Sequence, residues 1–225
     1  MRVVIFGASG MLGAGVLRAC LLDPAVTHVL CVGRTPPAQQ HEKLRAIVHT
    51  DFADFRAIES ELADFDACFR LGVSAFRMKE ADYRRVTYDF TLAAANALAH
   101  HSPGLVFVYV SGAGTDSTEK GSAMWARVKG QTENALFKLP FIDAYMFRPG
   151  YIQPVHGAVS KTRLYRVAYA LAAPLFPLWK LLFRKHVTTN ENVARAMLRV
   201  AKDGAAQRVL TNVDIETLAA LPAAA

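Results

Sequence analysis

A glycine-rich stretch near the N-terminus constrains the fold of this chain more than any other feature. Arg2–Phe6 is a β-branched run of strand length, and residues 7–13, GASGMLG, follow it with glycine at every third position. Met11–Leu22 then has apolar residues at helical spacing and stops at Asp23-Pro24. A strand, a glycine turn and a helix in this order predict one unit of a parallel sheet whose turn approaches a ligand.

The same alternation of strand-length and helical stretches continues to residue 150. Continuous apolar strands between helices are typical of a parallel sheet covered on both faces. Right-handed crossovers then predict an α/β, doubly wound Rossmann fold. The expected strands are Arg2–Phe6, Val29–Val32, Ala46–His49, Ala67–Leu71, Leu105–Val110 and Ile142–Phe147. The expected helices are Met11–Leu22, Phe55–Ala63, Ala81–His100 and Ser122–Leu139.

Composition indicates one folded domain over residues 1–225. Hydrophobic residues make up 52% of the 225 residues and charged residues 20%, which excludes a mainly disordered chain. The net charge of +7 is uneven, because residues 1–160 carry 16 basic and 15 acidic groups and residues 161–208 carry 10 and 2. The sequence therefore does not predict a uniformly cationic surface, and we expect no nucleic-acid partner.

The cysteines and the N-terminal sequence indicate the cellular compartment in which the protein is expected. Cys20, Cys31 and Cys68 form no C-x-x-C pair and lie near no histidine at metal-ligand spacing, so we expect buried free thiols and no metal site. The opening MRVVIFGASG differs from a signal peptide, because its apolar run stops at Gly7. We therefore expect a reducing, cytoplasmic location.

The glycine stretch fits a dinucleotide. Gly7 permits the tight turn, Gly10 lets the backbone approach a pyrophosphate, and Gly13 lets the helix pack against the strand. The helix N-terminus then offers unpaired N–H groups and a partial positive charge to phosphates. The expected cofactor contacts in this loop are Gly7, Ser9, Gly10, Met11, Leu12 and Gly13.

Further contacts are expected at the ends of later strands. Gly33 lies 20 positions after Gly13, where an acidic residue would bind the ribose of NAD, and Arg34 stands beside it. A guanidinium suits a 2′-phosphate, so we favour NADP(H) over NAD(H); the alternative is that Arg34 stacks on adenine or faces solvent. The fold also places Asp51-Phe52 near adenine and Leu71-Gly72-Val73 near the inner ribose.

Four motifs resemble the atypical, epimerase/dehydratase-like branch of the short-chain dehydrogenase/reductase superfamily. They are GASGMLG at 7–13, VSGAG at 110–114, WARVKG at 125–130 and FRPG at 147–150. The spacing is similar to that of Tat-interacting oxidoreductase-like proteins, and the resemblance covers residues 1–152. Residues 187–194 resemble the late strand-to-helix return of extended members. The resemblance also adds Pro149 and Gly150 to the cofactor contacts.

In that superfamily a Ser, a Tyr and a Lys carry the chemistry. The resemblance matches Ser111 to the serine, which orients the substrate oxygen, and Lys129 to the lysine, which binds the ribose hydroxyls. The tyrosine position holds Trp125, whose indole does not titrate usefully. Trp125 could instead line a flat aromatic pocket. The other candidate proton carriers in the sequence are Tyr88, Tyr151, Asp116 and His156.

A basic, apolar segment follows the sixth strand. Residues 161–186 hold six Lys and Arg and no acid, and prolines and charges interrupt them too often for a membrane span. We expect residues 154–186 to form a small, mainly helical cap over a lipophilic substrate. The alternatives are peripheral contact with an anionic membrane, at the inner membrane face, and a dimer surface or core with a basic rim.

These observations favour an NADP(H)-dependent oxidoreductase acting on a hydrophobic carbonyl or a quinone-like small molecule. The competing hypothesis is a non-catalytic NADP(H)-binding redox sensor or scaffold that has lost activity with the tyrosine. By the resemblance, the helices at 81–100 and 122–139 favour a homodimer.

Overall fold

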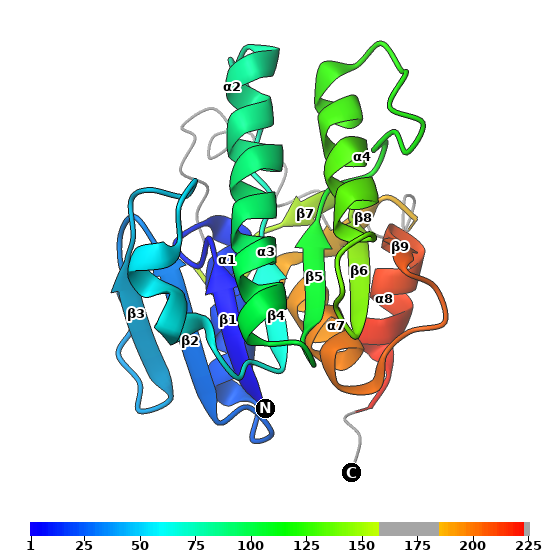
Figure 1. Ribbon diagram of the computed structural model, residues 1–225. Helices are drawn as coiled ribbons and strands as arrows, with labels where there is room; N and C mark the ends of the chain where they lie inside the picture. Colours follow the sequence, from blue (N-terminus) through cyan, green and yellow to red (C-terminus); the bar gives the residue numbers. More distant parts are fainter. Residues whose placement is uncertain (158–184, 223–225) are drawn as a thin grey trace.

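A parallel sheet forms the centre of the molecule (Figure 1). The computed structural model describes residues 1–157 and 185–222. Within these residues the main sheet has seven strands in the order β3-β2-β1-β4-β5-β6-β9, and each neighbouring pair is parallel. The strands are β1 (Arg2–Phe6), β2 (His28–Gly33), β3 (Leu44–Val48), β4 (Ala67–Arg70), β5 (Val106–Val110), β6 (Asp143–Arg148) and β9 (Val209–Thr211). The predicted doubly wound Rossmann fold is confirmed, because the strand order reverses beside β1.

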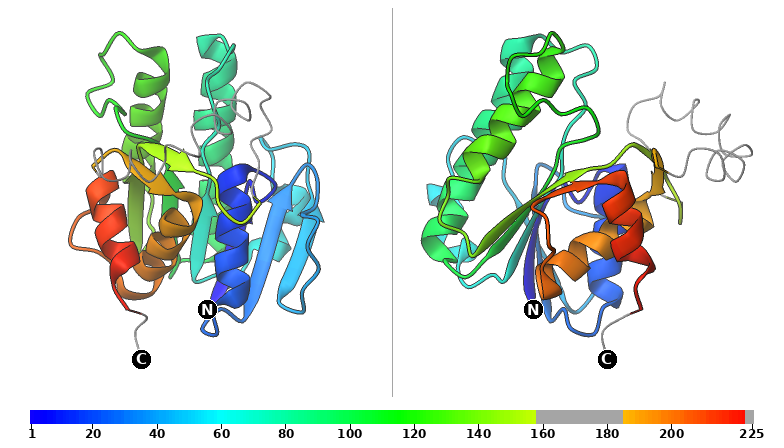
Figure 2. Two further views of the ribbon diagram at one scale, coloured as in Figure 1. Left: turned by 180° about the vertical axis from the view of Figure 1, so that it is seen from behind. Right: turned by 90° about the vertical axis from the view of Figure 1, so that its right-hand side faces the viewer.

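Helices cover both faces of the sheet, as the right-hand view of Figure 2 shows. One face carries α1 (Met11–Leu22), α7 (Asn190–Asp203) and α8 (Asn212–Ala220). The other carries the 3₁₀ helix η1 (Arg56–Leu62), α3 (Phe90–His101) and α4 (Met124–Leu136). Each face has its own hydrophobic core: along β1, Val3 and Ile5 enter one core, and Val4 and Phe6 enter the other. This alternation follows from the two-residue period of a strand.

The cysteines pack inside these cores as free, buried thiols, as predicted. Burial raises the pKa of Cys31 to about 12 and also raises the pKa values of Cys20 and Cys68. Because only the thiolate is a good nucleophile or metal ligand, these side chains act as small apolar groups. Among the described residues, no group of three or more His, Cys, Asp or Glu side chains is arranged to hold a metal.

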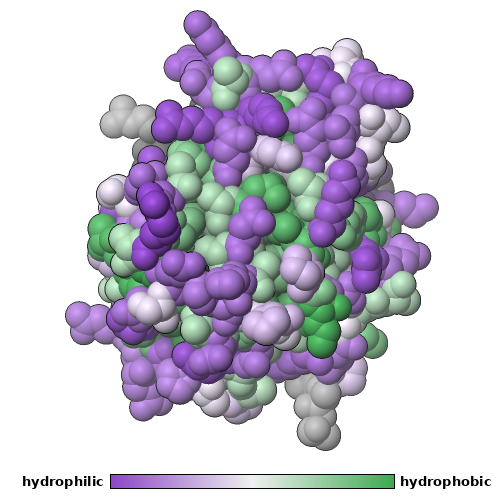
Figure 3. Space-filling view, in the orientation of Figure 1, coloured by the Kyte–Doolittle hydropathy of each residue, from purple (hydrophilic) through white to green (hydrophobic). Residues whose placement is uncertain are grey.

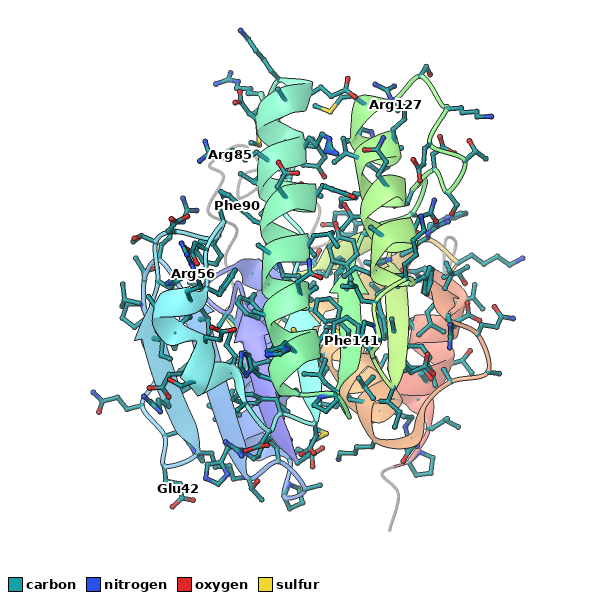
Figure 4. All side chains as sticks on the ribbon, viewed as in Figure 1. Glu42, Arg56, Arg85, Phe90, Arg127 and Phe141 are labelled. Atoms are coloured by element: carbon teal, nitrogen blue, oxygen red, sulfur yellow. The ribbon has the colours of Figure 1, made fainter. Side chains whose placement is uncertain are left out.

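The long helix predicted at 81–100 has three parts. They are α2 (Glu80–Arg84), a π-helical turn η2 (Arg85–Asp89) and α3. Together with α4, this composite helix rises beyond the carboxyl ends of the strands (Figures 1 and 2). Arg127 lies near the top of α4 (Figure 4) and donates to Glu80 of α2 at 2.8 and 2.9 Å. The two helices therefore stand as paired walls above the sheet edge where a ligand is expected.

The late part of the chain contains the strand-to-helix return that the resemblance placed at 187–194, together with elements that no sequence pattern predicted. Besides α7, β9 and α8, the short strands β7 (Tyr151–Gln153) and β8 (Val187–Thr189) pair in parallel. Gly150 precedes β7 and has no room for a side chain, because an added Cβ would lie 2.2 Å from the His186 carbonyl oxygen. Residues 158–184 lie outside the described residues, so the helical cap predicted at 154–186 and the single-domain assignment stay predictions.

No described helix combines the length and apolar character needed to cross a bilayer. In the orientation of Figure 3, apolar residues gather in a central band over the α3–α4 face, with hydrophilic residues around it. The proposed membrane-contacting segment 161–186 is described only at residues 185 and 186. The membrane contact predicted for it therefore stays a prediction.

The loop after β5 packs closely on α4 at a glycine, and this contact is testable. A Cβ added at Gly130 would lie 1.8 Å from the backbone oxygen of Asp116. We expect Gly130→Ala to lower the free energy of unfolding by about 1–3 kcal/mol, because backbone must move to admit the methyl group. Gly104→Ala is the matched control, since nothing lies within 4 Å of its added Cβ. Equal denaturant midpoints for the two variants would contradict this packing.

Candidate active site

The glycine turn after β1 forms an anion cradle. Gly7 has a φ of +96°, and a Cβ at Gly13 would lie 2.1 Å from the Gly7 carbonyl oxygen. Gly10 begins α1 without a side-chain cap, and the first turn of α1 contains no acidic residue. The N–H groups of this turn are therefore available to phosphate oxygens, as a dinucleotide pyrophosphate requires. Ser9, Met11 and Leu12 lie at the same turn and are exposed or half-buried.

Arg34 stands at the end of β2, directly after Gly33. Its side chain is exposed, and it forms no hydrogen bond or ion pair with another described residue. The guanidinium is thus available at the side of the sheet where the fold places the adenosine ribose.

The two residues expected beside adenine have different surroundings. Asp51 is exposed, and its Oδ1 accepts a hydrogen bond from the Ala53 N–H at 3.1 Å. Phe52 is half-buried in an aromatic cluster, with its ring centroid 5.7 Å from His49 and 6.0 Å from both Phe55 and Phe90. The ring of Phe52 therefore serves packing between η1 and α3, and its contact with adenine stays a prediction.

The ends of β4 and β5 meet Lys129 of α4. A Cβ added at Gly72 would lie 2.4 Å from the Val110 carbonyl oxygen and 3.7 Å from Lys129 Nζ. A Cβ at Gly7 would lie 3.4 Å from Leu71 Cβ, so the glycine turn lies beside the same strand end. The chain thus gathers the predicted cofactor residues from β1, β4 and α4 at one edge of the sheet.

Pro149 and Gly150 join this edge from β6. The Ala113 N–H donates to the Pro149 carbonyl at 2.8 Å, and the Gly150 N–H donates to Asn212 Oδ1 at 3.0 Å. These bonds fix the β6 end against the loop that follows β5. They place both residues next to the lysine site, and their contact with a cofactor stays a prediction.

Lys129 is partly buried and has few partners. Its Nζ donates to the Ser111 backbone carbonyl and lies 6.0 Å from the ring centroid of Trp125. Burial lowers the pKa of Lys129 to about 8, and the nearby Glu133 carboxylate opposes this shift. An ammonium with this pKa is charged at neutral pH and loses its proton only slightly above neutral pH.

Ser111 does not present its hydroxyl to the lysine pocket. The hydroxyl donates to Glu133 Oε1 at 2.5 Å and lies 3.1 Å from the Phe147 carbonyl, and the residue is only 4% exposed. The substrate-orienting role expected for Ser111 stays a prediction, and this geometry argues against it. The residue acts here through its backbone carbonyl, which holds Lys129.

A buried ion pair behind Ser111 was absent from the sequence prediction. Arg148 Nε donates to Glu133 Oε1 at 3.1 Å, Arg148 Nη2 donates to Glu133 Oε2, and the Glu133 side chain is 1% exposed. Arg148 Nη2 also donates to Ser117 Oγ at 2.5 Å. Two signals could have indicated it: Glu133 lies four residues after Lys129 on the same helix face, and Arg148 belongs to the FRPG motif.

A pocket of about 410 Å³ opens between the paired helices. It is lined by Val73, Ser74, Ala75, Phe76, Tyr83, Trp125 and Lys129. Trp125 packs on the loop after β5, since a Cβ at Gly114 would lie 3.2 Å from its ring. Tyr83 comes from α2, and no sequence pattern singled it out. Five of the seven lining residues are apolar or aromatic, and Ser74 and Lys129 add polar groups, which suits a hydrophobic ligand with a polar end.

The four alternative proton carriers lie outside this pocket. Tyr88 packs under the Arg84 guanidinium, and the Tyr151 hydroxyl donates to Gln153 Oε1 at 2.8 Å. Asp116 accepts from Thr118 and from the Gly121 N–H, and these bonds lower its pKa to about 2. His156 pairs with Glu191 at 3.0 Å. Each side chain therefore has a structural contact of its own.

Comparisons with known proteins show which folds this chain resembles. No family model matches the chain. Among solved structures, it is similar to the Bordetella bronchiseptica enzyme WbmF in complex with NAD⁺ (TM-score 0.65, 20% identity, 96% of this chain and 76% of that one). It is also similar to a short-chain dehydrogenase/reductase family oxidoreductase from Burkholderia thailandensis (TM-score 0.65, 17% identity, 90% and 85%). UDP-glucose 4-epimerase from Thermotoga maritima gives a TM-score of 0.65 at 13% identity, over 97% and 81%.

The chain therefore has the fold of the short-chain dehydrogenases/reductases and NAD-dependent epimerases, which confirms the predicted resemblance at the level of the fold. By sequence, curated relatives are fungal proteins named Fmp52. The Emericella nidulans protein is 28% identical over 158 residues, which are 67% of this chain and 66% of the relative. The Candida albicans protein is 23% identical over 155 residues, with the same coverage. The chain thus spans about two thirds of the length of these relatives.

The expected cytoplasmic location, including the inner membrane face, is wrong by this comparison. The Emericella nidulans, Scheffersomyces stipitis and Candida albicans relatives are each named as mitochondrial proteins. Free cysteines are compatible with both the cytoplasm and mitochondria, so they could not distinguish these two compartments.

The buried ion pair predicts a specific stability effect. We expect Glu133→Ala to lower the free energy of unfolding by about 3–5 kcal/mol, because it leaves the Arg148 charge without its partner. The double variant Glu133→Ala with Arg148→Met should recover most of this loss, measured by chemical denaturation. Glu42→Ala is the matched control at an exposed site (Figure 4). Independent, additive losses in the double variant would refute the coupling.

Proposed function

We propose that the chain is a nicotinamide-dependent oxidoreductase that acts on a hydrophobic carbonyl or a quinone-like molecule. The observation that carries this proposal is a pocket with apolar and aromatic side chains that Lys129 also lines. The pocket lies at the edge of the sheet that also holds the glycine turn after β1. This arrangement supports binding of a dinucleotide along the carboxyl ends of the strands with its reactive end at the pocket.

The chain's own residues divide the work of holding the cofactor. The N–H groups at the start of α1 bind the pyrophosphate, and Lys129 binds the ribose hydroxyls nearest the pocket. Arg34 binds a 2′-phosphate, which makes NADP(H) the preferred form. When bound, the reduced cofactor supplies a hydride.

The pocket walls support a hydrophobic substrate. Val73 and Phe76 are 39% and 43% exposed, and both line the pocket together with Trp125. Burying these side chains against an apolar ligand removes their surface from water, at about 25 cal/mol per Å². A flat carbonyl or quinone ring also fits against the indole of Trp125.

A second function, a non-catalytic NADP(H)-binding redox sensor or scaffold, is favoured by one residue. Trp125 stands where the resemblance expects the tyrosine, and an indole N–H donates a hydrogen bond without exchanging a proton. In this alternative the lysine and glycine cradle serve binding alone.

Location and partners are part of the proposal. The names of the fungal relatives favour a mitochondrial location. The apolar band over the α3–α4 face favours a homodimer through these helices (Figure 3). Membrane contact through residues 161–186 stays a hypothesis from sequence.

Arg34 tests the cofactor preference. We expect Arg34→Asp to weaken NADPH binding by about 10- to 100-fold, because a charge-assisted hydrogen bond to phosphate is lost. NADH binding should change far less, so the ratio of the two dissociation constants is the measurement. Arg45→Asp, on the neighbouring strand, is the control. An unchanged ratio in Arg34→Asp would reject the 2′-phosphate contact.

Activity separates the two functions. We expect the chain to oxidise NADPH with at least one member of a panel of hydrophobic aldehydes, ketones and quinones, and Lys129→Met to weaken NADPH binding and abolish turnover. Saturable NADPH binding without turnover on any member would favour the sensor or scaffold. Absence of NADPH and NADH binding would reject both.

A further inference from the structure

The proposed reaction requires a proton donor in the pocket, and the expected tyrosine is Trp125. Reduction of a carbonyl places negative charge on its oxygen, and a positioned acid of suitable pKa accelerates this step by about 10²–10⁴-fold. The identity of the side chain that supplies this proton rests on the proposed function.

Several polar groups near the pocket are already committed elsewhere. The Ser111 hydroxyl donates to the buried Glu133 carboxylate, and Glu133 itself is held by Arg148. Asp116 keeps its charge through bonds from the loop that contains Gly121, and its pKa is about 2. A group that stays ionised at neutral pH has no proton to give. The lining of the pocket includes none of these side chains, neither Ser111 and its partners nor Asp116.

Tyr83 is one of two titratable side chains that line the pocket, and its hydroxyl is enclosed. The residue is 0% exposed, and its hydroxyl lies 3.4 Å from the Val73 carbonyl oxygen. Burial raises its pKa above the ordinary tyrosine value. The side chain therefore contributes a wall of the pocket, and its hydroxyl donates to the carbonyl of Val73, another residue of the same lining.

Lys129 is the other titratable side chain, and it faces the pocket from α4. Its Nζ has the Ser111 carbonyl as a hydrogen-bond acceptor and the Trp125 ring at 6.0 Å. No described carboxylate forms an ion pair with it, so its proton is not locked in a salt bridge. The charged and titratable groups around it are Glu133 on its own helix, Arg148 bound to Glu133, and Tyr83 across the pocket.

We propose that Lys129 is the proton donor of this site, in the chemical role of the tyrosine that Trp125 replaces. As the hydride reaches the carbonyl carbon and forms a C–H bond, the electron pair of the C=O bond moves to oxygen. The oxygen takes a proton from the Lys129 ammonium. The neutral amine then recovers its proton from water.

The surroundings of Lys129 suit this role. Burial brings its pKa to about 8, near the pH at which a general acid is most effective. The Trp125 ring lies beside the ammonium, and the Ser111 carbonyl holds the ammonium by a hydrogen bond. The Glu133 carboxylate limits how far burial lowers the pKa of Lys129, so the amine remains protonated at pH 7.

Ionisation of Lys129 is the first test and needs no substrate. The side-chain amines of protein labelled with [6-¹³C]lysine are titrated by NMR, and Lys129→Arg assigns the resonance. We expect a midpoint near pH 8, against about 10.4 for ordinary lysines. Glu133→Gln should move the midpoint lower, because the carboxylate favours the charged amine. A midpoint above pH 10 in the wild-type chain overturns the proposal.

Turnover is the second test, on whichever panel substrate is reduced. Lys129→Arg keeps the charge and the hydrogen-bond donor but cannot release a proton near neutral pH. We expect it to lower kcat by about 10²–10⁴-fold with a far smaller change in NADPH affinity. Lys138→Arg, at an exposed position after α4, is the matched control.

Tyr83→Phe separates the two titratable residues. We expect it to lower kcat far less than Lys129→Arg does, because the hydroxyl that it removes is bonded to the Val73 carbonyl and its pKa is raised by burial. A large loss in Tyr83→Phe with kcat retained in Lys129→Arg overturns the proposal in favour of Tyr83. If the wild-type chain reduces no substrate, the proposed function fails, and the ionisation midpoint still decides on Lys129.

Discussion

The buried Glu133–Arg148 ion pair is the interaction on which the site depends. Glu133 joins α4 to the end of β5 through the Ser111 hydroxyl and to the end of β6 through Arg148. Because Ser111 is held in this way, its carbonyl faces the ammonium of Lys129, one helical turn before Glu133. Removing one partner would leave an unpaired charge in the core, so this geometry is strongly enforced. The position of the Lys129 ammonium thus depends on the buried ion pair through Ser111.

The first 150 residues could be predicted well because their periodicity is local. β-Branched runs and glycine turns placed six strands within two residues of their observed bounds. The π-helical turn at Arg85–Asp89 interrupts a continuous helical pattern, and nothing in the pattern marks it. The strand β7 has three residues, too few for a periodic signal, and β8 was indicated only by the resemblance at 187–194. The pairing of β7 with β8 joins segments far apart in the chain.

The site was predicted in part, for a similar reason. Gly10 and Gly13 pack against Gly7 in one turn, and Lys129 lies beside Gly72 and Gly112 at the ends of the neighbouring strands. The roles of Ser111 and Tyr83 depend on which way a side chain points across several elements, and sequence spacing does not fix that. Trp125 is half-buried and lines the pocket, at the position where the resemblance expects a tyrosine. Lys129 lines the same pocket, and burial lowers its pKa.

A crystal structure of the chain with bound NADP⁺ tests the proposed site most directly. The geometry predicts the pyrophosphate on the N–H groups at the start of α1, the 2′-phosphate beside Arg34, and the ribose hydroxyls within reach of Lys129 Nζ while Nζ stays bonded to the Ser111 carbonyl. The nicotinamide ring should lie at the pocket lined by Trp125 and Tyr83. A dinucleotide bound away from α1, or with its nicotinamide end outside this pocket, would contradict the proposed oxidoreductase site.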